Sequence, residues 1–187
     1  GGLGYFRALF QTCSEVMLRI TQLPQPVIAE VSGIATAAGC QLVAACDLAV
    51  ASNDARFATS GVNIGLFCST PLVALSRTVA RKHAMEMLLT GGFIDAQQAV
   101  GMGLVNRTVP GGELADATRQ LAMDIASKTP AAIKVGKRLF YEQATLSMKE
   151  AYAMAVEVMA CNMMADDTTA GIDAFINKRP MPEWRGK

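Results

Sequence analysis

The spacing of apolar and polar positions divides the chain into an α/β part and a helical part. Apolar side chains recur every three or four residues over residues 6–20, which predicts an amphipathic helix. The apolar run at residues 27–31 predicts a buried strand, residues 40–46 a helix and residues 48–51 a second strand. This strand–helix–strand order indicates a parallel sheet with crossover helices.

Further along, the α/β pattern continues for about sixty residues and then stops. The pattern predicts a short strand at 57–58, a loop at 59–71, helices at 72–79, 82–89 and 96–100, and a strand at 105–109. Only helices are predicted afterwards, at 113–127, 131–143, 148–164 and 169–177. We therefore expect an α/β core over residues 1–110 and a helical region over residues 111–187.

Composition narrows the class of protein. Hydrophobic residues make up 51% of the chain and charged residues 18%, which excludes intrinsic disorder. Seventeen Lys and Arg oppose sixteen Asp and Glu, and this balance argues against a nucleic-acid partner. No apolar run has the roughly 18 residues that a membrane span needs, and we expect no secretory signal. Five scattered cysteines indicate free thiols in a reducing compartment.

A candidate anion site lies where the first strand leads into the next helix. Most of residues 32–39 are small, so a ligand could approach the backbone closely, and the first N–H groups of a helix attract negative charge. The alternative is a tightly packed crossover in which small residues serve packing alone, and the spacing leaves both open. Cys40 at this helix start is interpreted as a buried thiol, because the single histidine, His83, gives it no evident base. With one histidine and no C-x-x-C pair, we expect no metal site.

Several segments, in order along the chain, resemble one family. They are PVIAEVSG at 26–33, ATAAGCQL at 35–42, ACD at 45–47, LTG at 89–91, IDAQQA at 94–99 and GIDAFINKR at 171–179. These resemble the enoyl-CoA hydratase/isomerase (crotonase) family over essentially the whole chain. The resemblance implies a crotonase-like spiral of ββα units with a C-terminal helical trimerisation region, and hence a homotrimer or a dimer of trimers. It implies acyl-CoA thioesters as substrates, with coenzyme A part of the substrate and no separate cofactor.

The same resemblance assigns roles to residues. Ala38 stands where a backbone N–H forms one donor of the oxyanion hole, and Gly39 beside it is expected to bind substrate. Gln41 and Gly61 stand where the family has its two catalytic glutamates. The loop at 66–70 carries no carboxylate, and its Ser69 is expected to line the substrate pocket.

The end of the last predicted helix supplies the expected nucleotide contacts. Phe175 and Lys178 match the segment that holds the adenine and the phosphates of coenzyme A in the family, with the contact coming from a neighbouring subunit. The alternative is an ordinary helix end, at which Lys178 and Arg179 complement the helix dipole.

Two candidate functions follow from the absence of the two family glutamates at Gln41 and Gly61. Without carboxylates at positions 41 and 61, efficient hydration is not expected, because an amide does not exchange protons near neutral pH. The chain is then either an acyl-CoA enzyme of another reaction (isomerisation, thioester hydrolysis or another enolate process) or a catalytically silent acyl-CoA-binding or assembly subunit. Family members begin with further strands that supply the second oxyanion donor, and nothing here matches them. The expected location is a bacterial cytoplasm or the mitochondrial matrix.

Overall fold

The computed structural model describes residues 2–186, and its contacts divide the chain into two compact units. Unit 1 comprises Gly1–Thr21 and Val27–Leu121, and unit 2 comprises Gln22–Pro26 and Ala122–Lys187. The boundary between them falls within helix α6 (Leu114–Ala126). The outer ends of the expected ranges, residues 1 and 187, lie outside the described residues. Each unit is described by itself below.

Unit 1 contains two three-stranded sheets among its described residues. Their strands are β1 (Ile28–Val31), β2 (Ile34–Thr36), β3 (Leu48–Ser52), β4 (Arg56–Ala58), β5 (Ile94–Asp95) and β6 (Arg107–Val109). One sheet has the order β1-β3-β6 and is parallel throughout; the other has the order β2-β4-β5, with β5 antiparallel. The predicted parallel pairing of the first two apolar strands is thus confirmed, with Ile28 opposite Leu48.

Two strands were not predicted from the pattern. Residues 34–36 were expected to lie in a loop, and they form β2; residues 94–95 form β5. Strands of two or three residues have too short a pattern to be recognised, because their hydrogen bonds depend on a distant partner. For both of these strands the partner is β4.

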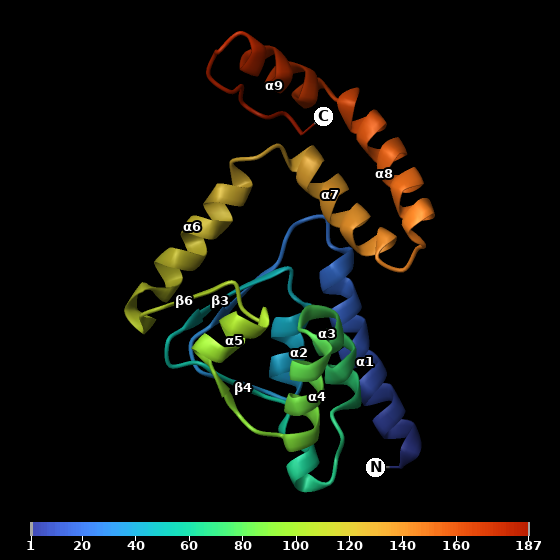
Figure 1. The fold of residues 1–187 in the computed structure, drawn as a ribbon, viewed down its shortest axis with the longest axis vertical. Helices are drawn as coiled ribbons and strands as arrows, with labels where there is room; N and C mark the ends of the chain where they lie inside the picture. Colours follow the sequence, from blue (N-terminus) through green and yellow to red (C-terminus); the bar gives the residue numbers. More distant parts are fainter. Residues whose placement is uncertain (1, 187) are drawn as a thin grey trace. The chain divides into compact units, whose positions relative to one another are not determined.

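Unit 1 also contains helices, of which α2 and α5 contact its strands (Figure 1). The helices are α1 (Leu3–Gln22), α2 (Ala38–Ala45), α3 (Ser69–Thr78), α4 (Arg81–Thr90), α5 (Ala96–Met102) and the short 3₁₀ helices η1 (Ser60–Ile64) and η2 (Gly111–Glu113). The predicted loop at 59–71 is therefore wrong in part, since it contains η1 and the start of α3. Asp95 caps α5 in a capping box with Gln98.

The core of unit 1 lies between these helices and the strands. Phe57 of β4 and Leu75 of α3 are almost completely buried, as are Met87 and Leu88 of α4. Helix α2 contacts both α3 and β2, so the start of α2 is held between a strand and a helix. This packing positions the segment on which the candidate site is built.

Besides Gln22–Pro26, the described residues of unit 2 form the end of α6, the helices α7 (Pro130–Gln143), α8 (Met148–Met163) and α9 (Asp166–Ile176), and the C-terminal tail (Figure 1). Helix α8 contacts α7 and α9. The carboxylate of Asp167 accepts hydrogen bonds from the Thr129 hydroxyl at 2.6 Å and from the backbone N–H groups of Arg185 and Gly186, each at 2.8 Å. Asp167 thereby ties the tail to the α6–α7 connection.

Candidate functional site

The carboxyl ends of two parallel strands meet at the start of α2. Thr36 ends β2 opposite Ala58, which ends β4. Just beyond, the N–H of Ala37 donates to the carbonyl of Ala58 at 3.0 Å, and the hydroxyls of Thr36 and Ser60 are hydrogen-bonded at 2.8 Å. Ligands of α/β sheets bind beyond such carboxyl ends. The structure therefore gives the candidate anion site the expected topological position, with a second strand that the sequence did not reveal.

The helix start itself presents backbone donors. The first hydrogen bond of α2 joins the N–H of Gln41 to the carbonyl of Ala37 at 3.0 Å, so the N–H groups of residues 38–40 have no carbonyl within the helix to bind. Ala38, the first residue of α2, is exposed. Ala37 has a φ of 48° and a ψ of −113°, a conformation that favours glycine. Backbone strain is thus stored immediately before the N–H that the family resemblance assigns to the oxyanion hole.

The glycine in the first turn of α2 is not required by packing. A Cβ added to Gly39 would lie 4.0 Å from the Cβ of Ala35, an ordinary contact, and a Cβ on Gly33 would meet nothing within 4 Å. The interpretation of this segment as a crossover that needs small residues for packing alone is therefore not supported at these two positions. The lack of a side chain at Gly39 leaves open space beside the first turn of α2.

Gln41 is buried and has a specific partner. Its side chain is 4% exposed, and the thiol of Cys13 on α1 donates to its Oε1 over 3.7 Å. An amide held in this way can donate through its NH₂ group but cannot take up or release a proton near neutral pH. The sequence pattern did not single out Cys13 for this role, because a contact between residues 28 positions apart leaves no local signal.

Gly61 is closed to any side chain. A Cβ at this position would collide with the backbone carbonyl oxygen of Leu66 and would lie 2.9 Å from the sulfur of Cys68. The φ of Gly61 is not the obstacle, because among the described glycines positive φ occurs at residues 65, 91, 103 and 186. The obstacle is instead the space taken by the loop that follows η1.

Two buried cysteines, Cys40 and Cys68, lie near this position. Burial, and then the neighbouring Cys68, raise the pKa of the Cys40 thiol to about 12. Cys40 is 1% exposed and Cys68 is 6% exposed. The interpretation of Cys40 as a buried structural thiol is confirmed, because a nucleophilic thiol requires a lowered pKa.

Ser69 stands at the start of α3, not in a loop. Its hydroxyl donates to the carbonyl of Phe67 at 3.3 Å, and its N–H donates to the same oxygen at 2.8 Å. Both groups therefore serve the local turn before the helix. A role in substrate binding stays a prediction.

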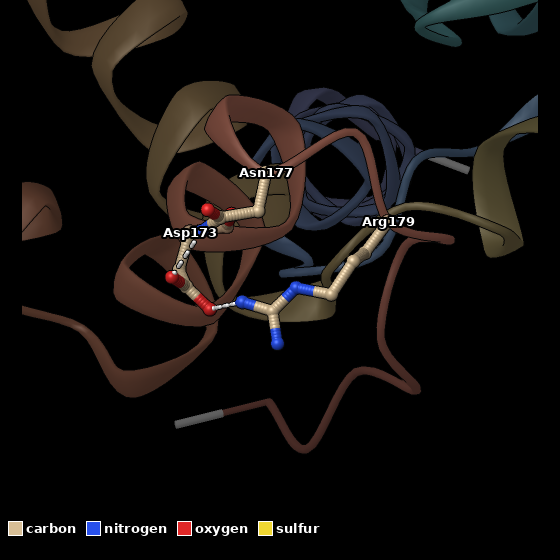
Figure 2. A network of polar contacts seen from close by, with 3 residues as sticks. All are labelled: Asp173, Asn177 and Arg179. Atoms are coloured by element: carbon tan, nitrogen blue, oxygen red, sulfur yellow. Dashed lines mark hydrogen bonds and ion pairs between the residues drawn. The ribbon is translucent and has the colours of Figure 1, made fainter.

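The expected nucleotide contacts lie in unit 2. Phe175 is 75% exposed near the end of α9, and Lys178 is exposed just beyond that end. Figure 2 shows the polar contacts at this helix end, where Asp173 binds both Asn177 and Arg179. The structure thus places Ala38, Gly39 and Gln41 at the start of α2 and Gly61 in η1, all in unit 1, and Phe175 and Lys178 at the end of α9 in unit 2.

Residues 2–186 contain neither a metal-binding cluster nor a membrane-spanning helix. No group of three or more His, Cys, Asp or Glu side chains in this part of the chain could hold a metal ion. None of its helices is both long enough and apolar enough to cross a lipid bilayer.

Comparison with known proteins identifies the family. A family model described as enoyl-CoA hydratase/isomerase matches residues 7–187. Enoyl-CoA hydratase domain-containing protein 3, mitochondrial, from Rattus norvegicus is 50% identical over 183 residues, which are 98% of this chain and 61% of that protein. The chain therefore spans about three fifths of the length of such curated relatives.

Solved structures agree. The crystal structure of enoyl-CoA hydratase from Mycobacterium smegmatis is 55% identical and superposes with a TM-score of 0.96, covering 98% of this chain and 71% of that one. Human enoyl-CoA hydratase domain-containing protein 3 is 50% identical with a TM-score of 0.94, covering 97% of this chain and 72% of that one. The expected crotonase-like α/β fold with C-terminal helices is confirmed, and the chain belongs to the enoyl-CoA hydratase/isomerase family.

Proposed function

We propose that this protein binds acyl-CoA thioesters without hydrating them. In this proposal the backbone N–H of Ala38 polarises the thioester carbonyl, and Phe175 and Lys178 hold the nucleotide of coenzyme A. The single observation that carries it is the closure of position 61 by the Leu66 carbonyl, which leaves no room for a second acid. Coenzyme A enters as part of the ligand, and no separate cofactor is invoked.

The absence of hydration follows from the chemistry of the site. Adding water to an enoyl thioester needs a base to activate the water and an acid to protonate the α-carbon, and each positioned group contributes a factor of about 10²–10⁴. Gln41 offers an amide that the Cys13 thiol already engages, and Gly61 offers only backbone. Neither position therefore supplies a group that exchanges protons.

The first turn of α2 supports the proposal that the protein binds an acyl-CoA thioester. Backbone donors at the first turn of a helix stabilise a negative oxygen, and the helix dipole adds to the effect. Ala38 is exposed, and open space lies beside Gly39, so the carbonyl of a thioester has access to this turn. Alanine in place of glycine keeps the N–H that the interaction needs.

An enolate-forming enzyme is the rival function, and one experiment separates the two. Binding of butyryl-CoA and free coenzyme A is measured by calorimetry, and hydration of crotonyl-CoA by loss of enoyl absorbance. Exchange of the α-protons of butyryl-CoA in D₂O, followed by NMR, reports enolate formation. We expect binding with neither hydration nor exchange. Exchange would establish the enzyme, and hydration at a rate typical of the family would overturn the proposal.

Matched variants test the location of the acyl group. Gly39→Leu fills the open space beside the first turn of α2 and should weaken butyryl-CoA binding about tenfold or more, with coenzyme A itself less affected. Gly101→Leu is the control, because a Cβ on Gly101 of α5 also meets nothing within 4 Å and Gly101 is exposed. Equal effects of the two variants would place the acyl group elsewhere.

The cellular location proposed is the mitochondrial matrix or a bacterial cytoplasm. The rat relative is named mitochondrial, and the similar enoyl-CoA hydratase from Mycobacterium smegmatis is bacterial. Fractionation of the source cells followed by immunodetection would test the location.

A further inference from the structure

Helix α9 ends in a backbone arrangement that normally requires glycine. The N–H of Arg179 donates to the carbonyl of Ala174 at 2.8 Å, and the N–H of Lys178 donates to the carbonyl of Phe175 at 3.2 Å. These two bonds form the Schellman motif, in which the residue after the cap adopts a left-handed conformation and is usually glycine. Here that residue is Lys178, with a φ of 51°. A side chain is therefore kept at a position where it strains the backbone, and such strain marks candidate functional residues.

The two neighbouring cations at this helix end differ in their partners. The guanidinium of Arg179 forms an ion pair with the carboxylate of Asp173, whose other oxygen accepts a hydrogen bond from Asn177 at 2.8 Å (Figure 2). Asn177 also donates to the backbone carbonyl of Asp173 at 2.9 Å. Within residues 2–186 the ammonium of Lys178 has neither a hydrogen bond nor an ion pair.

We propose that Arg179 is a positioning residue that acts by occupying Asp173, so that Lys178 stays free to bind a phosphate. This inference rests on the proposed function, in which Lys178 contacts the phosphates of coenzyme A. An unpaired carboxylate on the last turn of α9 would repel a phosphate and compete for the Lys178 ammonium. Arg179 removes that charge, while Asn177 holds the carboxylate in place.

The alternative is that the Asp173–Asn177–Arg179 cluster only stabilises the end of the helix. Both interpretations predict lower stability when the cluster is disturbed, so stability does not separate them. The direction in which the affinity for coenzyme A changes separates the two interpretations. Loss of Arg179 should weaken phosphate binding, and loss of the Asp173 charge should strengthen it, because Arg179 is then released toward the ligand.

The experiment is a double-mutant cycle with coenzyme A as the probe, using Arg179→Gln, Asp173→Asn and the double variant. Calorimetry at low salt should show coenzyme A binding weakened about threefold by Arg179→Gln, strengthened about threefold by Asp173→Asn, and close to the parent in the double variant. The differences should shrink at high salt, because the pair is exposed. Pantetheine, which lacks the phosphates, should bind all four proteins equally.

Two further variants distinguish failure of the proposed nucleotide contact from failure of the positioning role of Arg179. Lys178→Ala should weaken coenzyme A binding, and if it does not, the proposed nucleotide contact itself fails. If Lys178→Ala weakens binding while the two charge variants shift the affinity in the same direction, only the positioning role of Arg179 is overturned. Asn177→Ala removes cap hydrogen bonds without changing the charge. It should lower the melting temperature while preserving the salt dependence of binding, and circular dichroism checks that every variant is folded.

Discussion

The N–H of Leu66 donates to the carbonyl of Gly61 at 3.0 Å, and the carbonyl oxygen of Leu66 fills the space that a Cβ on Gly61 would need. This reciprocal contact joins the start of η1 to the loop after it. At the position where the family has its second glutamate, the backbone of Leu66 therefore leaves no room for a side chain. Restoring the two family glutamates by Gln41→Glu and Gly61→Glu would therefore require the Leu66 loop to move.

Gly61→Ala tests this closure directly. The added methyl group should destabilise the protein by about 1–3 kcal/mol, because it is forced against backbone that cannot rotate away. Urea denaturation measures the change. Gly33→Ala is the control, since a Cβ at Gly33 meets nothing within 4 Å, and its stability should stay within about 1 kcal/mol of the parent. A Gly61→Ala protein as stable as the control would show that the loop adapts readily.

Ala37→Gly should stabilise the protein by about 1 kcal/mol. Relief of the positive φ at Ala37 exceeds the extra entropy that glycine has in the unfolded chain. Ala44→Gly, in the interior of the same helix, should destabilise by at least about 0.5 kcal/mol, because there the φ is ordinary and a buried methyl group is lost. Thermal unfolding measures the melting temperatures of the two variants. A lower melting temperature for Ala37→Gly than for the parent would show that the backbone at Ala37 is not strained.

The hydrogen bonds that the Asp167 carboxylate accepts should make the protein less stable in acid. Hydrogen bonds from Thr129, then from the backbone of Arg185 and Gly186, hold the pKa of Asp167 below its ordinary value of 3.8. Because the folded pKa is lowered, the stabilisation is complete above the unfolded value and is lost as the pH falls through the folded one.

Asp167→Asn isolates this contribution from that of the other carboxylates. The variant should melt at a lower temperature than the parent at pH 7, and the gap should narrow once the pH falls below the ordinary value of 3.8. Melting curves recorded across the acid range measure the gap. A difference independent of pH would show that charge is not what Asp167 contributes.

Thiol labelling should distinguish the cysteines. Cys40, buried and with its pKa raised to about 12, should resist iodoacetamide at pH 8 in the folded protein. Exposed Cys161 should be modified. Mass spectrometry of the digested protein assigns the labels, and unfolding in urea before labelling is the control in which both react. Labelling of Cys40 in the folded state would require an opening that the structure does not contain.

Oligomerisation is predicted from the apolar surface of unit 2. Met159 is 71% exposed, Met164 83% and Phe175 75%, and such surfaces are usually covered in symmetric assemblies. We expect light scattering to give three or six times the 19.8 kDa of one chain. Met159→Glu should shift the mass toward the monomer, whereas Gln97→Glu on α5 of unit 1 should not. A monomeric parent at micromolar concentration would contradict the prediction.

The sequence by itself determined the elements whose pattern is local. The helical period over residues 6–20 corresponds to α1, and the apolar run at 27–31 corresponds to β1. The ordered motifs also carried the family, because they report inherited chemistry at particular positions. In each case the signal lies within a few residues, which is the range over which helix, strand and cap preferences act.

Only the tertiary structure decided how distant residues share space. The strand β2 exists because β4 offers it hydrogen bonds, and Gln41 is engaged because α1 brings Cys13 to it. Gly61 looked like a missing glutamate in the sequence, and the structure makes it a position with no room for one. These facts depend on packing between segments far apart along the chain, and the local spacing of residue types carries no record of such distances.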